Sequence, residues 1–201
     1  MASSIYNSFP PAAPAPLDMN TVLSKMNEGG GPQRSARFAV RINLSGSFTQ
    51  PYLRISNDLV YLCEVAEFPG RSFMNSDIRY YGPSVKFPFQ SVYEDVNFTF
   101  LCRPKSEERF FFDGWMEKVN PISTFDFNYK IDYACSVDVF QLDEQHKTSY
   151  MITLVEAYPI QISPQPVTWA DDNFQRLAVT FTYSKWYRSQ IDKLQVPTAN
   201  T

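Results

Sequence analysis

Apolar and polar residues alternate along several stretches of the chain, the first of which begins at residue 37. Phe38, Val40 and Ile42 alternate with small or polar residues, and a period of two is typical of a strand with one buried face. Proline and glycine separate these stretches, as they do at turns. The pattern therefore predicts a mainly β domain. Its strands are expected at residues 37–44, 59–66, 73–80, 85–89, 96–102, 131–140, 150–157 and 176–186.

One stretch has the period of a helix. Ser106 is placed as an N-cap, and Phe111, Trp115 and Val119 follow at intervals of four residues, which puts the three apolar side chains on one helix face. We expect this face to pack on the strands. The fold class predicted is a β-sandwich or partial barrel with one packed α-helix.

The ends of the chain differ from its middle. Residues 1–36 are rich in proline and contain three consecutive glycines at 29–31, a composition typical of a flexible arm. Within this arm, residues 17–26 could form two helical turns, which would be marginal without a partner. We therefore expect an arm at 1–36, one β domain at 37–188 and a loose C-terminal tail at 189–201.

Charge and hydropathy exclude two classes of protein. The 18 Lys and Arg residues are outnumbered by 21 Asp and Glu residues, so the chain lacks the basic face of a protein that grips nucleic acid. No stretch approaches the roughly 18 apolar residues of a membrane span. We expect a soluble protein, made in a cytoplasm, that does not bind membranes. Aromatic residues reach 16%, which favours strands and large contact surfaces.

Candidate catalytic chemistry is sparse. His146 is the one histidine and lies in a polar loop, where a general base would have no fixed neighbours. Cys63, Cys102 and Cys135 are too far apart for a zinc site and are interpreted as small buried apolar residues. Acidic residues occur as adjacent surface pairs, which we interpret as solvated. No catalytic residue, metal or cofactor is predicted, and the chain is not expected to be an enzyme.

Three segments carry a resemblance to a known family. They are CEVAEFPGRSFMNSDIRYYGPSVKFP at 63–88, FTFLCRPKSEERFFFDGWMEKV at 98–119 and VTWADDNFQRLAVTFTYSKWY at 167–187. Together they resemble the tail tube proteins of contractile-tailed bacteriophages. The first is similar to the family's strand, proline turn and long hairpin, the second to its strand and helix, and the third to its closing strands. The arm at 1–36 departs from the shorter N-termini of that family.

The resemblance implies a structural virion protein of the phage tail. In such a protein, six subunits join their sheets into one continuous barrel, and the rings stack into a hollow tube through which DNA is ejected. The implied partners are other copies of the chain, the tail sheath protein, baseplate tube proteins, and the tape measure protein and transient DNA in the lumen. A baseplate tube initiator or adaptor of the same fold is one alternative. A monomeric β-sandwich binding module is another, from a different class.

The wet faces of the long strands are candidates for the wall of this lumen. In the strand expected at 131–140, apolar residues occupy one face, and Asp132, Ser136 and Asp138 occupy the other. Thr180 and Thr182 hold similar positions in the last strand. An acidic or neutral wall suits a DNA conduit, because a basic wall would hold phosphates. The alternative for each residue is an ordinary solvent-facing surface.

Overall fold

The computed structural model describes residues 18–28, 31–46, 48, 51–79, 81–170 and 172–189. The chain divides into two units, residues 1–36 and 37–201. In the first unit, helix α1 spans Met19–Asn27 and buries none of its side chains. It overlaps residues 17–26, where two helical turns are expected, and ends one residue later. The rest of the predicted C-terminal tail beyond residue 189 lies outside the described residues, as do residues 1–17 of the predicted arm.

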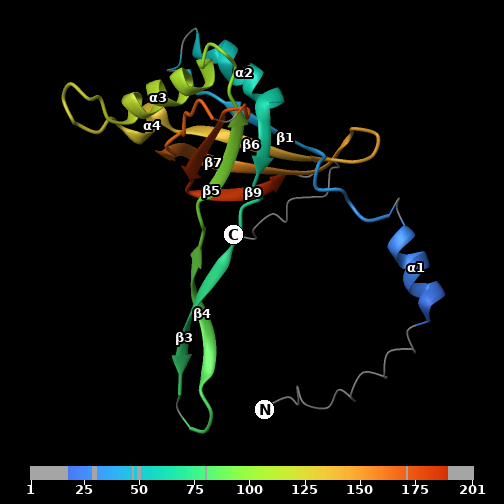
Figure 1. Ribbon diagram of the computed structural model, residues 1–201. Helices are drawn as coiled ribbons and strands as arrows, with labels where there is room; N and C mark the ends of the chain where they lie inside the picture. The colour runs from blue at the N-terminus through green and yellow to red at the C-terminus, as the bar shows by residue number, and fades with distance from the viewer. Residues whose placement is uncertain are drawn as a thin grey trace. The chain divides into compact units, whose positions relative to one another are not determined.

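The second unit is built on antiparallel strands (Figure 1). Seven of them form one sheet in the order β1-β6-β7-β8-β5-β2, with β9 paired to β7, and the other two, β3 and β4, form a separate hairpin. The strands are β1 Phe38–Asn43, β2 Cys63–Ala66, β3 Ser72–Ile78, β4 Val85–Val92, β5 Val96–Leu101, β6 Cys135–Leu142, β7 Thr148–Ile162, β8 Arg176–Thr182 and β9 Lys185–Ser189.

The long strand β7 joins the two halves of the sheet. Its first half pairs with β6 and β9, and its second half pairs with β8. Between them Glu156 adopts a positive φ of 54°, which is uncommon for a residue with a side chain and marks a bend. The bend lets the two halves curve around a shared core. The strand expected at 150–157 is the longer β7, and the strand expected at 176–186 is divided into β8 and β9.

Three helices accompany the sheet, where one packed helix was expected. They are α2 Tyr52–Leu62, α3 Glu107–Val119 and the single turn α4 Lys130–Tyr133. The predicted strand at 59–66 was wrong in its first half, because Ile55 and Leu59 lie four residues apart on the buried face of α2. The predicted strand at 131–140 was also wrong in its first residues, which form α4.

Helix α3 begins where the sequence indicates, but its N-terminus is not capped as expected. Ser106 has a left-handed φ of 49° and its side chain makes no capping hydrogen bond. The fully buried Glu108 carboxylate instead accepts hydrogen bonds from the backbone N–H of Arg103 at 3.0 Å and from its Nε at 2.6 Å. Gly114 leaves room for Tyr52 of α2, because an added Cβ would lie 2.3 Å from the Tyr52 hydroxyl and would displace that side chain.

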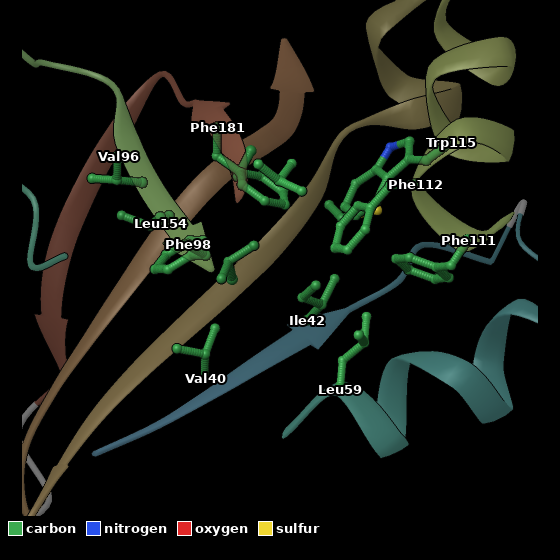
Figure 2. Close-up of a cluster of buried hydrophobic side chains, with 14 of the residues drawn as sticks. Val40, Ile42, Leu59, Val96, Phe98, Phe111, Phe112, Trp115, Leu154 and Phe181 are labelled. Carbon is green, nitrogen blue, oxygen red and sulfur yellow. The ribbon is translucent and has the colours of Figure 1, made fainter. Parts of the chain in front are cut away.

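The core lies between the inner face of the curved sheet and the helices α2 and α3 (Figure 2). Trp115 is fully buried, and its indole N–H donates a 2.9 Å hydrogen bond to the Tyr133 carbonyl. Aromatic rings from β5 and β8 meet those of α3: Phe100 is tilted against Phe112, and Phe181 lies edge-on to Trp115 at 5.8 Å between centroids. The expected mainly β fold is confirmed, and the sheet does not close into a barrel within the subunit. The correction is that two long helices, rather than one, pack on the sheet.

Candidate assembly surfaces

The β3–β4 hairpin extends from the sheet edge beyond the body of the domain (Figure 1). It continues the β2–β5 ladder outward, because β2 leads into β3 and β4 leads into β5. Gly82 near its tip has a φ of 79°, a conformation that glycine adopts without strain. Every residue of β3 is exposed. The hairpin therefore has little contact with its own subunit beyond its base.

Several contacts fix the direction of the hairpin at its base. The Trp186 indole of β9 donates a 3.2 Å hydrogen bond to the Gly70 carbonyl. Arg71 donates to the Ser91 hydroxyl at 3.2 Å and lies over the Phe73 ring. On the other side, Tyr183 donates to the Glu94 carbonyl at 2.8 Å, and burial raises the pKa of Tyr183 to about 12, so its hydroxyl keeps the donated proton.

The two faces of the hairpin differ in polarity. Cross-strand partners share a face, and the register pairs Ser76 with Phe87 and Ile78 with Val85. With Met74, the apolar members Ile78, Val85 and Phe87 dominate this face, on which Ser76 is the polar exception, and each of the four is at least 40% exposed. The opposite face pairs Asp77 with Lys86. We call the first the apolar hairpin face, defined by Met74, Ile78, Val85 and Phe87, and the second the polar hairpin face, defined by Asn75, Asp77 and Lys86.

The edges of the sheets are also open. In the part of the chain that the structure describes, β1 pairs only with β6, β2 only with β5 and β9 only with β7. Among the same described residues, both strands of the hairpin pair only with each other. An unpaired edge presents backbone N–H and C=O groups that another strand can satisfy. The domain therefore offers several positions where a further strand could join.

The predicted lumen residues occupy different environments. Asp132 lies in α4 rather than in a strand, so the alternation that included it was wrong. Ser136, Thr180 and Thr182 are partly exposed, on the sheet face opposite the core. Thr180 donates a 2.7 Å hydrogen bond to Asn97 on the neighbouring strand.

Asp138 also lies on that outer sheet face, but it is only 4% exposed. Its carboxylate accepts hydrogen bonds from Arg41 at 3.1 Å, Asn43 at 2.7 Å and Thr153 at 2.7 Å. These neighbours on β1 and β7 cover the carboxylate, which therefore cross-links three strands. Asp138 was expected to face water, and in the subunit it does not. The alternation of residues shows which sheet face a side chain lies on, but it does not show whether neighbouring side chains cover that side chain.

The predicted helix face lies in the core. Phe111 and Trp115 are fully buried and Val119 is 9% exposed. Phe111 and Trp115 contact each other edge-on at 5.7 Å between ring centroids. These three side chains hold α3 against the sheet and are not available to another subunit.

The polar side chains that could support catalysis are dispersed. His146 is exposed in the β6–β7 turn, with a φ of 59°. Burial raises the pKa of all three free cysteines, that of Cys63 to about 12, so their thiolates are scarce at neutral pH. Among the described residues, no three His, Cys, Asp or Glu side chains gather as metal ligands, and no helix is long and apolar enough to span a membrane.

Two surface segments were not found from the sequence. One is residues 121–131, where aromatic side chains point outward, and the other is residues 166–176, which carries the exposed Val167, Trp169 and Phe174. The alternation in FDFNYKI at 125–131 was the available signal for the first. The polar and apolar faces of the hairpin could likewise have been read from the alternation of Met74, Asn75 and Asp77.

A β domain with open sheet edges and an uncovered hairpin has the features of a subunit that completes its sheets in an assembly. The chain belongs to the phage tail tube protein family, whose model matches residues 33–189. The resemblance seen in the sequence is thereby confirmed, and the family indicates a structural tube role in a phage tail. No curated protein matches the chain.

Solved structures give the same fold. A chain of the anti-feeding prophage baseplate, 6-fold symmetrised, is 14% identical with a TM-score of 0.61, and the match covers 81% of this chain and 98% of that one. Chains of an extracellular contractile injection system are similar too. One comes from the sheath/tube terminator in the extended state (12% identity, TM-score 0.57, covering 79% of this chain and 97% of that one). Another comes from the sheath-tube complex in the extended state (11% identity, TM-score 0.55, covering 87% and 99%).

Proposed function

We propose that the chain is the subunit of stacked six-membered rings that form the hollow tube of a phage tail, through which DNA is ejected. The observation that carries this proposal is the β3–β4 hairpin, which has two unpaired edges and an uncovered apolar face. A two-stranded hairpin is marginally stable in water by itself. Pairing with strands of neighbouring copies would satisfy its backbone groups and join the sheets into one barrel.

The number six is supported by analogy. The baseplate structure that shares this fold is described as 6-fold symmetrised. A head-to-tail contact between identical subunits closes a ring when its rotation divides a full turn. Sheet joining is such a contact, because it uses a different edge on each side of the subunit.

The polar hairpin face, with Asn75, Asp77 and Lys86, is a candidate for the lumen wall beside Ser136, Thr180 and Thr182. It balances one acidic against one basic side chain. A wall without net positive charge would let DNA slide, because each phosphate contact strengthens salt-dependent binding. Asp138 is not included among these lumen candidates, because its carboxylate is covered by neighbouring side chains.

The proposed partners follow from this role. Other copies of the chain provide ring closure and ring stacking, the tail sheath protein surrounds the tube, and baseplate tube proteins continue it. The tape measure protein and transient DNA occupy the lumen. The site of action is the virion, after synthesis in the host cytoplasm. A role without catalysis agrees with the dispersed polar side chains.

A baseplate tube initiator or adaptor is the second candidate. The family match begins at residue 33, so most of the N-terminal arm is an addition to the shared fold. Helix α1 in this arm exposes Met19, Leu23 and Met26, which lie on one face at helical spacing. Such a face suits a contact that only one ring of the tail makes. A monomeric binding module is disfavoured, because it would leave the hairpin uncovered.

Sedimentation velocity of the purified protein, followed by negative-stain electron microscopy, tests the proposal. The expected result is a species of about 139 kDa, six times the 23.2 kDa subunit, and tubes of stacked rings at higher concentration. Single rings that do not stack would favour the adaptor. A 23.2 kDa monomer at every concentration would overturn both candidates and support the binding module.

A further inference from the structure

A row of apolar side chains projects from the connection between α3 and α4 and from the start of α4. Ile122, Phe125, Phe127, Tyr129 and Ile131 are between 70% and 84% exposed. The connection extends from the helical end of the domain (Figure 1). We call these five residues the aromatic ridge.

The ridge is held in place by the residues between its members. Asn128 donates from its backbone N–H to the Val119 carbonyl at 3.1 Å and from its side chain to the Lys118 carbonyl at 2.8 Å. Lys130 donates to the Glu156 carboxylate at 2.6 Å and to the Ser184 hydroxyl at 2.5 Å. The alternate polar residues therefore face the body, and this leaves the apolar side chains facing outward.

Two backbone conformations at the ridge are strained. Phe125 has a φ of 58°, and Glu156, which anchors Lys130, has a φ of 54°. A left-handed conformation of a bulky residue costs free energy that the surrounding structure must offset.

The size of the ridge is that of one side of an interface. An aromatic side chain buries roughly 150 Å² or more, so five side chains of about that size, each between 70% and 84% exposed, present about 600 Å². The largest apolar patch on a typical monomer is about 300–600 Å², and one partner in a standard interface buries about 800 Å². The ridge therefore lies at the upper end of the range for a monomer and approaches the area of one side of a standard interface.

The apolar hairpin face is the matching surface on the same chain. Met74, Ile78, Val85 and Phe87 are between 40% and 55% exposed and carry no charge, as the five ridge side chains carry none. The hairpin extends away from the end of the domain that holds α3 and α4 (Figure 1). One subunit consequently cannot bring its own two surfaces together.

We propose that the aromatic ridge of one copy receives the apolar hairpin face of the next copy. The inference rests on the proposed ring or tube function and identifies where neighbouring subunits meet. Two uncharged apolar surfaces lose no ion hydration on contact, whereas a charged partner would have to be dehydrated against the ridge. Because the two surfaces differ, the contact is head-to-tail and propagates from copy to copy.

Complementation between two variants tests this contact. Phe87→Asp disables the hairpin face and leaves the ridge, and Phe127→Asp disables the ridge and leaves the hairpin. Each variant alone is expected to lose at least tenfold of its assembled fraction in sedimentation velocity. Mixed one to one, they should form a dimer and nothing larger, because only one intact ridge and one intact hairpin face remain to pair.

The controls separate folding, function and contact. Trp169→Asp alters an equally exposed aromatic residue outside both surfaces and should assemble as the wild type does. Thermal unfolding verifies that each variant is folded, and Tyr129→Asp replaces Phe127→Asp if that variant is not. Wild-type protein that stays monomeric would overturn the proposed function and this contact with it. Wild-type assembly together with variants that still assemble, or with mixed variants that do not pair, would overturn the contact alone.

Discussion

Replacing Trp115 by alanine should cost the subunit about 3–5 kcal/mol of folding free energy, the range for truncating a fully buried tryptophan. The indole is 0% exposed and contacts the rings of Phe48 and Phe181 at 5.5 and 5.8 Å between centroids. The substitution also removes the 2.9 Å hydrogen bond to the Tyr133 carbonyl. A buried acceptor left without its donor adds about 1 kcal/mol or more, which places the expected loss in the upper part of the range.

Urea unfolding followed by circular dichroism, at concentrations where the subunit is monomeric, measures this loss. With a slope of about 2 kcal/mol/M, the midpoint should fall by roughly 2 M. Trp115→Phe keeps an aromatic ring but loses the hydrogen bond, so its unfolding midpoint should lie between those of the alanine variant and the wild type. Trp169→Ala, at a fully exposed indole, should change stability by less than about 0.5 kcal/mol. A Trp115→Ala change below about 1 kcal/mol would refute the assignment of the α3 face to the core.

Three further predictions concern the arm, the covered carboxylate and pH. Deleting residues 1–30 should weaken ring stacking in electron micrographs and leave the unfolding midpoint unchanged, and normal tubes from the truncated protein would disprove a role for the arm. Asp138→Ala should destabilise the subunit by about 1–3 kcal/mol in urea, because it leaves the buried Thr153 hydroxyl without its acceptor and removes the hydrogen bonds from Arg41 and Asn43. A neutral effect would mean that Arg41 and its neighbours simply turn to water. Hydrogen bonds from Lys130 and Ser184 lower the pKa of Glu156 in the folded subunit. The ionised Glu156 should therefore stabilise the fold fully above its unfolded-state pKa of about 4.3. This stabilisation should be lost as the pH falls through the lower pKa of the folded state. Glu156→Gln should remove that part of the acid profile.

The sequence predicted most strands because their alternation coincides with one buried face. In β1, Val40 and Ile42 are buried, and Arg41 between them is exposed. The same alternation misled at residues 131–133, where Ile131 is exposed and Tyr133 ends a single helical turn. Helix α2 was missed because its last residues form an apolar, β-favouring run, and its helical identity depends on Leu59 packing into the core beneath α3.

The assembly surfaces were harder to predict than the fold. An apolar residue belongs to the core if it is buried in the subunit and to a possible contact surface if it is exposed. A sequence pattern shows only which residues share a face, and therefore cannot distinguish the two. Phe98 and Phe127 look alike in the sequence, yet the first is fully buried and the second is 76% exposed. Conversely, Asp138 lies at a position that the alternation predicts to be solvent-exposed, yet side chains from two other strands cover it.

A cryo-EM reconstruction of the assembled protein tests the central claim most directly. The account predicts six copies in each ring, with the β3–β4 hairpin of each copy joined to its neighbour and the polar hairpin face toward the channel. Assembled particles in which the hairpins project into solvent without touching another subunit would contradict it, and so would a protein that yields no particles larger than a monomer.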